Sequence, residues 1–266
     1  MRQLLLALSA AVLGVIFTQV ALAADLPIKA PVAPVAAVPN WTGFYFGGAV
    51  GARWANNDWR SSDLFPTFGP TPQVGNTSGA MASAGARFSA YAGYNWQFAP
   101  TWIAGIEADI GWANNSKTAN PLPGTNNTAA PLGLPIGTVK ETWDGSLRGR
   151  LGYLVTPDTL LYGTGGVAWQ HVRLSAYCPT NGAVVFFCFL PQNESHSKTM
   201  TGWTVGGGLE MKVWGNWLAR IDYRYADFGT FDQVFFTANP PFFDDRFTAH
   251  VKVQTHTVTV GLAYLF

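Results

Sequence analysis

Four histidines are the side chains of this 266-residue chain best suited to general acid–base chemistry: His171, His196, His250 and His256. His196 lies in the stretch Glu194-Ser195-His196-Ser197, and Asp244-Asp245 precede His250. A hydrolytic site needs a nucleophile, a base and a group that orients the base, brought together by the fold rather than by adjacency in sequence. Because these residues match no recognised nucleophile motif, we predict no catalytic site. We interpret the histidines as solvated loop residues, except His256, which faces outward on the last strand, near an aromatic girdle or a local bulge.

The same histidines suggest a second hypothesis, the capture of a ligand such as haem. His171, His196 and His250 are candidate axial ligands, although isolated histidines near loops are weak evidence for such a site. Cys178 and Cys188 are ten residues apart, and no neighbouring Cys/His set completes a metal site around them. The sequence therefore predicts no resident cofactor and no metal.

Charged side chains recur at every second residue in several segments, opposite large apolar residues. Asp144, Arg148 and Arg150 alternate with Trp143, Leu147 and Leu151. Residues two apart in a strand lie on the same face of a sheet. The set assigned to one common face by this spacing is Arg53, Arg87, Glu107, Asp109, Asp144, Arg148, Arg150, Glu210, Lys212, Arg220, Asp222 and Arg224.

Eight segments alternate in this way, and all but 160–172 and 251–266 carry these charges: 43–54, 84–98, 102–113, 141–155, 160–172, 199–213, 217–228 and 251–266. The short connections 99–101, 156–159 and 214–216 alternate with the long ones 55–83, 114–140, 173–198 and 229–250. An up-and-down antiparallel sheet then has all its short turns at one end and all its long loops at the other. This asymmetry predicts an all-β, eight-stranded antiparallel transmembrane β-barrel.

The two faces of the segments indicate how such a barrel is oriented. Eight strands enclose an interior just wide enough for side chains, so the charged and small residues belong inside. The large apolar face must then point outward, into lipid. Two sets of aromatic residues support this: Trp54, Trp112, Trp143, Trp169, Trp203 and Tyr225 beside the long loops, and Trp96, Phe98, Trp102, Tyr153, Trp217, Tyr264 and Phe266 near the turns. We expect the charges to form a salt-bridged plug, and a narrow ion path is the alternative.

The composition agrees with strands in lipid and with export. Charged residues make up only 12% of the chain, against about 25% in a typical soluble domain, and mean hydropathy is +0.12, too mild for a helical bundle. The apolar run from Leu4 to Phe17 and the small residues near Ala23 predict a cleaved signal peptide over 1–23, followed by a Pro/Ala-rich periplasmic linker over 24–40 and the barrel over 41–266.

Export has consequences for the cysteines and for the charge. It places Cys178 and Cys188 in an oxidising compartment, where a local disulfide between them is plausible. Loss of Arg2 with the signal peptide leaves 15 basic and 15 acidic residues. A balanced net charge gives no indication of nucleic acid as a partner.

Three stretches resemble a known family: residues 24–51, with Trp41-Thr42-Gly43-Phe44-Tyr45 entering the first strand, IDYRYADFG at 221–229, and VTVGLAYLF at 258–266. They are similar to the OmpA-like eight-stranded outer-membrane barrels, and most similar to the alphaproteobacterial surface-antigen porins, which include major antigens and haem-binding proteins. The resemblance implies an outer-membrane location and a role in envelope integrity or surface interaction.

The closing segment also resembles the terminal signal that the barrel assembly machinery recognises, with Thr259, Gly261, Tyr264 and Phe266 at the corresponding offsets. This strand must pair with residues 43–54, because an open sheet edge is not tolerated in lipid. The expected partners are therefore outer-membrane lipid, the assembly machinery and external molecules that meet the loops. The expected function is a barrel with a side-chain-filled lumen that supports the envelope and displays loops; the alternatives are a small-solute channel and, lower, haem or ligand binding.

Overall fold

The computed structural model describes residues 40–63, 78–124, 135–179, 191–237 and 246–266, so the predicted signal peptide and nearly all of the predicted linker lie outside it. Its strands are β1 Gly43–Ser62, β2 Gly79–Ala80, β3 Ser83–Ala99, β4 Trp102–Ala119, β5 Ile136–Thr156, β6 Thr159–Cys178, β7 Gln192–Trp214, β8 Trp217–Phe235 and β9 Phe247–Leu265. None of the described residues forms a helix long and apolar enough to cross a membrane.

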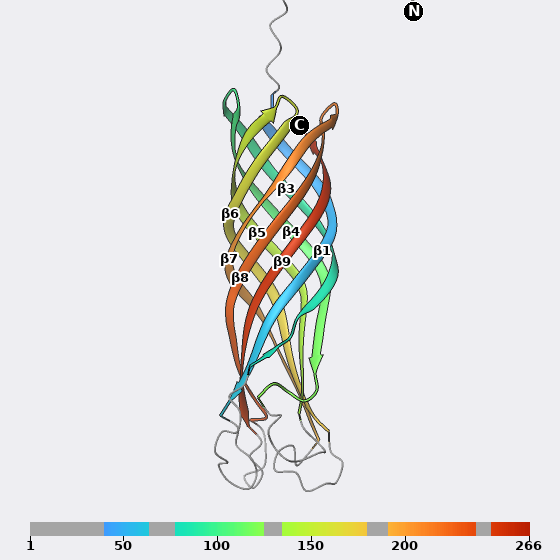
Figure 1. Ribbon diagram of the computed structural model, residues 1–266, viewed down its shortest axis with the longest axis vertical. Helices are drawn as coiled ribbons and strands as arrows, with labels where there is room; N and C mark the ends of the chain where they lie inside the picture. The colour runs from blue at the N-terminus through green and yellow to red at the C-terminus, as the bar shows by residue number, and fades with distance from the viewer. Residues whose placement is uncertain (1–39, 64–77, 125–134, 180–190, 238–245) are drawn as a thin grey trace, which may run out of the picture. The chain divides into compact units, whose positions relative to one another are not determined.

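Eight of these strands form a closed ring (Figure 1), which confirms the predicted barrel. Neighbouring strands are antiparallel, and β9 pairs with β1 from Tyr45 opposite Leu265 to Ser62 opposite Thr248. The two-residue strand β2 pairs only with β1, outside the ring. The closing strand is therefore paired along both of its edges, with β8 and with β1, as closure in lipid requires.

A broad band of exposed apolar residues surrounds the barrel along the half of its length nearest the turns. On β1 the exposed residues Phe44, Phe46, Val50 and Trp54 alternate with buried ones. Ten residues separate Phe44 from Trp54, which at a strand tilt of about 40° and a rise of about 3.3 Å per residue corresponds to about 25 Å along the barrel axis. This equals the height of the lipid-facing band of an outer-membrane barrel.

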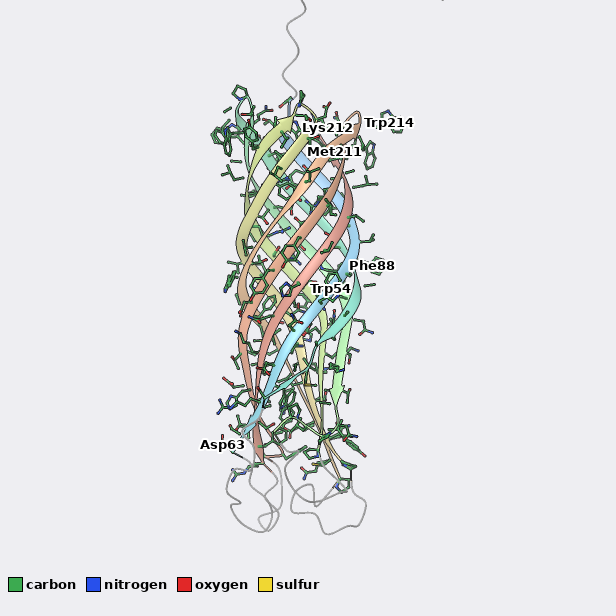
Figure 2. The ribbon with its side chains drawn as sticks, viewed as in Figure 1. Trp54, Asp63, Phe88, Met211, Lys212 and Trp214 are labelled. Carbon is green, nitrogen blue, oxygen red and sulfur yellow. The ribbon has the colours of Figure 1, made fainter. Side chains whose placement is uncertain are left out.

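The strands continue far beyond this band, contrary to the predicted strand ends. Trp54 is in the middle of β1, which runs on to Ser62, and Figure 2 shows Trp54 and Phe88 near mid-length with Asp63 toward the loop end. Likewise β4 reaches Ala119, β5 begins at Ile136 and β7 begins at Gln192, within segments predicted as loops. The aromatic residues mark a change of solvent and not the ends of strands. The additional eight residues of β1 correspond to about 20 Å of barrel beyond the band.

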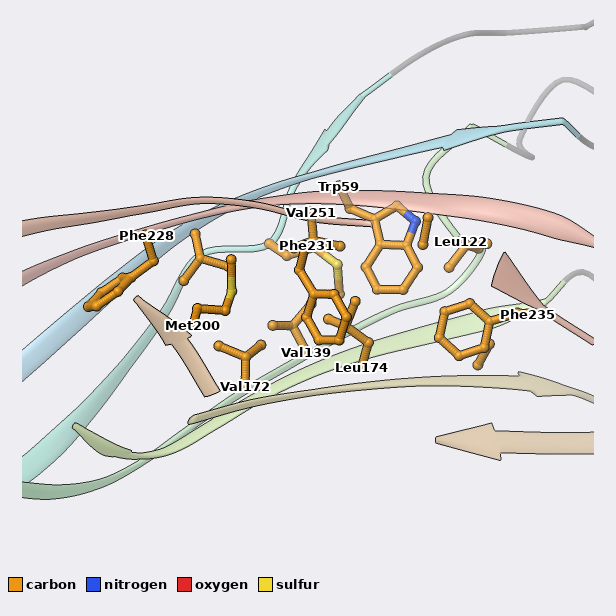
Figure 3. Close-up of a cluster of buried hydrophobic side chains, with 14 of the residues drawn as sticks. Trp59, Leu122, Val139, Val172, Leu174, Met200, Phe228, Phe231, Phe235 and Val251 are labelled. Carbon is orange, nitrogen blue, oxygen red and sulfur yellow. The ribbon is translucent and has the colours of Figure 1, made fainter. Parts of the chain in front are cut away.

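The ring divides into two sheets in this extension. Pairing between β7 and β8 stops at Trp203 opposite Asp227, and pairing between β3 and β4 stops at Arg87 opposite Ala113. One sheet, here the β8–β9–β1 sheet, comprises residues 230–235, 247–254 and 56–62; the other, the β4–β7 sheet, comprises 115–119, 136–141, 172–178 and 192–198. Trp59, Phe231, Phe235 and Val251 from the first pack against Val139, Val172 and Leu174 from the second (Figure 3).

Candidate functional site: a lumen closed by three layers of side chains

The turn end of the lumen is closed by Trp41, just before β1. Its side chain is 0% exposed; the indole Nε1 donates to the Pro157 carbonyl at 3.1 Å, and its backbone N–H donates to Gln97 Oε1 at 3.0 Å. Around it lies a buried apolar layer: Ile103, Leu154, Leu160, Leu218, Ala263 and Leu265. The sequence placed Trp41 at the entry to the first strand but did not predict that it seals the barrel.

Lys212 belongs to this end and not to the central charge network, which corrects its predicted place. Its Nζ donates to the Asn40 carbonyl at 2.9 Å and lies 5.0 Å from the centre of the Trp41 ring. Lys212 faces inward as predicted, but it is so close to the mouth that its amine reaches the chain entering β1. The ammonium therefore holds Trp41 in place through a hydrogen bond and a cation–π contact.

Glu107 is the centre of the charged layer nearest to this plug. Its carboxylate accepts from Arg148 and from Arg220 at 2.5 Å each, and from the Tyr45 hydroxyl at 2.8 Å. Arg150 lies 3.9 Å from Glu107, 3.4 Å from Glu210 and 4.2 Å from the centre of the Tyr162 ring. The guanidinium groups thus bridge several strands around one fully buried carboxylate.

The same charged layer continues toward the loop end around Asp144. Asp144 accepts from Arg224 at 2.7 Å, from Arg87 at 2.8 Å and from Arg53 at 3.1 Å. Asp109 joins the same layer through Arg87 at 2.6 Å and Arg224 at 2.8 Å. Asp222 also belongs to this charged layer, since it lies 3.7 Å from Arg148 and accepts from the Tyr162 hydroxyl at 3.1 Å.

Glycines on neighbouring strands make room for these large side chains. A Cβ at Gly111 would lie 2.4–2.7 Å from the Arg87 guanidinium, and a Cβ at Gly93 would lie 2.3 Å from the Tyr45 hydroxyl. Such separations are impossible for carbon atoms, so only glycine permits this packing. The small residues of the inner face are therefore the complement of its arginines and tyrosines.

Glu141 is a lumen carboxylate that the sequence did not predict. It is 1% exposed and accepts from Asn57 Nδ2 at 2.6 Å, while its backbone carbonyl accepts from Arg53 at 3.2 Å. Simple alternation from Asp144 would point Glu141 outward, but a bulge between Glu141 and Asp144 turns both inward. Glu141 lies on the loop side of Trp143, outside the apolar band. Burial raises the pKa of its carboxyl above the usual range, and the charge of Arg53 offsets only part of this rise.

With the revised set of residues, the charges that line the lumen sum to zero. Without Lys212 and with Glu141, six arginines face six carboxylates: Arg53, Arg87, Arg148, Arg150, Arg220 and Arg224 against Glu107, Asp109, Glu141, Asp144, Glu210 and Asp222. Every arginine in the set has at least one carboxylate partner within 4 Å. Buried charges are tolerated only when they are paired in this way.

The third layer is the apolar core between the two sheets of the extension. Phe235 stacks on Phe247 with ring centres 5.2 Å apart and on Trp59 at 6.4 Å, and all three side chains are fully buried. Cys178 ends β6 within this core and is disulfide-bonded. Its predicted partner, Cys188, lies outside the described residues, so the pairing stays a prediction.

The histidines lie on strands and not in loops, and their side chains have separate partners. His171 stacks on Trp143 at 5.9 Å, His196 contacts Glu194 at 2.5 Å, and His256 contacts the Tyr223 hydroxyl at 2.8 Å. Within the described part of the chain no group of three or more His, Cys, Asp or Glu side chains could hold a metal ion. The three candidate haem ligands are therefore distributed over β6, β7 and β9.

One row of polar side chains has the order of a hydrolytic triad, which sequence reasoning missed. His250 Nε2 is 2.9 Å from Ser62 Oγ, and His250 Nδ1 is 2.5 Å from Asp232 Oδ1. The Asp232 side chain is 62% exposed, and the Ser62 hydroxyl also contacts Asp63 Oδ2 at 2.9 Å. A catalytic carboxylate must be shielded to orient and stabilise an imidazolium, so this row acts as a surface hydrogen-bond chain across the β8–β9–β1 sheet.

The predicted assembly signal lies at the closing seam. Thr259 and Gly261 face the lumen, whereas Tyr264 and Phe266 are exposed on the apolar band with ring centres 5.0 Å apart. The Phe266 backbone N–H donates to the Phe44 carbonyl at 2.8 Å. The last residue is therefore part of the ring and also presents an aromatic side chain outward.

Comparisons with known proteins agree with this architecture. A family model described as outer membrane protein beta-barrel domain matches residues 21–266. The chain is 31% identical over 259 residues to the 31 kDa outer-membrane immunogenic protein of Brucella melitensis, covering 96% of this chain and 97% of that one. It is 30% identical to the 22 kDa outer membrane protein of Rhizobium leguminosarum, covering 75% and 70%.

Solved structures that it resembles include OprG from Pseudomonas aeruginosa, at 14% identity and a TM-score of 0.45, covering 85% of this chain and 97% of OprG. Neisserial surface protein A has 15% identity and a TM-score of 0.37, covering 85% and 98%. The lipid-facing ring and the match of the family model to residues 21–266 lead to the same assignment. The chain belongs to the outer membrane protein β-barrel domain family, and it resides in the outer membrane.

Proposed function

We propose that this protein is a closed, non-catalytic barrel that strengthens the outer membrane and displays its surface loops on a rigid stalk. The observation that carries the proposal is that three successive layers of side chains close the same lumen. Trp41 closes the turn end, the neutral arginine–carboxylate network fills the middle, and the core around Phe235 fills the extension. The turn end, with Trp41 and Phe266, then faces the periplasm.

Each layer opposes ion passage for a different physical reason. An ion entering the apolar layers would lose its hydration without gaining a polar partner, which costs many kcal/mol. In the charged layer it would have to separate pairs as close as 2.5 Å, such as Arg220 and Glu107. A small-solute channel, the alternative function, would require all three layers to open together.

Planar-bilayer conductance tests closure directly. We expect the purified protein to give no reproducible open steps, while a porin of known conductance in the same preparation gives its usual steps. The variant Trp41→Ala should also remain silent, because the two other layers still seal the lumen. Reproducible steps from the wild-type protein would overturn the closed barrel in favour of the channel.

The second part of the proposal concerns display at the cell surface. The extension raises the ends of its strands about 20 Å beyond the apolar band. Its outer face is mostly polar, which suits it to water. Several relatives carry the name outer-membrane immunogenic protein, in agreement with access from outside. A peptide tag inserted within 125–134 should be stained by antibody on intact cells, and the same tag at Gly215 should not; the reverse pattern would contradict this orientation.

Two lower hypotheses have simple tests. A haem titration of the purified protein should produce no spectral shift, because His171, His196 and His250 lie on different strands with separate partners. A fluorophosphonate probe should not label Ser62, because its triad-like row is open to solvent. A haem spectrum or covalent labelling at Ser62 would each reopen the corresponding activity.

A further inference from the structure

The two sheets of the extension differ in the charge of their water-facing sides. On the β4–β7 sheet, Lys140 lies directly opposite Arg173, with Ser116 and Ser197 at the two ends of the same cross-strand row. Like charges placed directly opposite each other destabilise a sheet. This row therefore holds an unfavourable pair that an anion would relieve.

The next row on the same face supplies hydroxyl groups. Thr118, Thr138, Ser175 and Ser195 follow one another across the four strands, with the Thr118 and Thr138 oxygens 3.0 Å apart and the Ser175 and Ser195 oxygens 2.7 Å apart. Hydroxyls are good donors to phosphate oxygens. Two cations beside a hydroxyl row form a surface that matches a phosphate group in charge and in donors.

No carboxylate on the described part of this face neutralises the two cations. The acids of these strands point the other way: Glu141 is buried, and Glu194 accepts from the Phe236 backbone N–H and contacts His196. Arg173 Nε donates to Ser197 Oγ at 3.0 Å, a neutral partner. The sequences 125–134 and 180–190, which join these strands, contain neither Asp nor Glu.

The β8–β9–β1 sheet provides an internal contrast. Its outward row Asp58–Lys252 pairs opposite charges, and Lys252 Nζ also lies 3.9 Å from Asp227. The next row on this face is Arg60–His250–Asp232, in which His250 lies 2.5 Å from Asp232. This face therefore balances its own charges and offers no excess attraction to anions.

Height relative to the apolar band identifies the kind of anion. Lys140 is three residues beyond Trp143, which corresponds to about 8 Å along the barrel axis. His171 connects the two levels, since it stacks on Trp143 with ring planes 9° apart and lies two residues before Arg173. Headgroups occupy the first 5–7 Å or so beyond the hydrocarbon core, so the cations stand at the outer edge of this layer.

We propose that this face, built on Lys140 and Arg173 with the hydroxyl row beside them, binds the phosphate of an anionic lipid headgroup in the outer leaflet. The apolar band below it contacts the acyl chains of the same lipid, which a soluble phosphate lacks. The site is independent of the lumen, so it does not depend on whether the barrel conducts.

The test is retention of lipid by protein purified from outer membranes in detergent micelles, measured by native mass spectrometry. The probes are bis-phosphorylated lipid A and the same lipid after dephosphorylation. Wild-type protein should prefer the phosphorylated form, and the double variant Lys140→Gln/Arg173→Gln should lose affinity about 25-fold, at about 5-fold per cation near an anionic surface. Higher salt should weaken binding to the wild type.

A matched control removes two outward cations from the other sheet. Arg60→Gln/Lys252→Gln should change lipid A affinity by less than about 3-fold, since the cross-strand rows of these two residues contain Asp232 and Asp58. Equal loss in both double variants, or equal binding of the two lipids by wild type, would overturn the proposal. Complete competition by excess inorganic phosphate would assign the face to soluble anions and would also overturn it. Heat-modifiable gel mobility verifies that each variant is folded.

Discussion

Glu107→Gln is the sharpest test of the charge network, because it preserves the shape of the side chain and removes only its charge. Glu107 is 1% exposed and is shared by Arg148 and Arg220 at 2.5 Å and by Arg150 at 3.9 Å. After the change, six arginines face five carboxylates, and the unbalanced charge lies where lipid surrounds the barrel. The Tyr45 hydroxyl keeps an oxygen acceptor, so the loss is mainly electrostatic.

The expected magnitude follows from the burial of these groups. Removing one partner of a buried ion pair costs about 3–5 kcal/mol, because the remaining charge is left uncompensated. Arg220 loses the only carboxylate within 4 Å of it in the described part of the chain, whereas Arg148 retains Asp222 at 3.7 Å and Arg150 retains Glu210 at 3.4 Å. We therefore expect the free energy of unfolding to fall within that range and not to double it.

Urea unfolding in micelles, followed by tryptophan fluorescence and gel mobility, measures this loss. The control Asp232→Asn removes a carboxylate that is 62% exposed, and it should cost less than about 1 kcal/mol. The double variant Glu107→Gln/Arg220→Gln restores neutrality and should be more stable than the two single effects predict by at least about 1 kcal/mol. If Glu107→Gln unfolds within about 1 kcal/mol of wild type, the salt-bridged lumen does not stabilise the barrel as argued.

Three further predictions address other parts of the chain. Phe235→Ala should cost about 3–5 kcal/mol and expose the extension to limited proteolysis while heat-modifiable mobility of the barrel persists; protection equal to wild type would contradict the apolar layer. Deletion of Phe266 should reduce insertion into the outer membrane in cells more than refolding in detergent, and normal insertion would refute its role as an address. Thiol titration of the denatured protein should find no free thiol before reduction and two afterwards, and free thiols before reduction would refute the Cys178–Cys188 pair.

The period of two was enough to predict the ring, its strand order and the direction in which most charges point. It succeeded because lipid outside and a narrow lumen inside impose opposite demands on alternate residues. Arg53, Arg148 and Asp222 are buried as the alternation predicted. The turn lengths, visible as Pro, Gly and Asn clusters, determined which neighbours pair.

The errors arose where local geometry breaks the period or where the solvent changes. A bulge beside Trp143 reverses the alternation of β5, so Glu141 faces inward unexpectedly. A second bulge between Asp227 and Thr230 on β8, where Gly229 has a φ of 73°, brings Phe231 and Phe235 to the inner face. Neither bulge changes the composition of its segment, so hydrophobic patterning alone could not reveal them.

The strand ends were predicted too early for a different reason. Beyond the apolar band the alternation continues, but the polar residues now face outward and the apolar residues face inward. On β1, exposed Phe46, Val50 and Trp54 give way to exposed Asp58 and Arg60, while Trp59 lies inside. Within the membrane, turning an apolar side chain inward gains nothing, since lipid is equally apolar, and paired charges can fill the lumen. Beyond it, water outside restores the hydrophobic effect, and the same strands must bury their apolar face. The residue at which this inversion occurs therefore marks the membrane boundary from sequence alone, and on β1 that residue is Trp54.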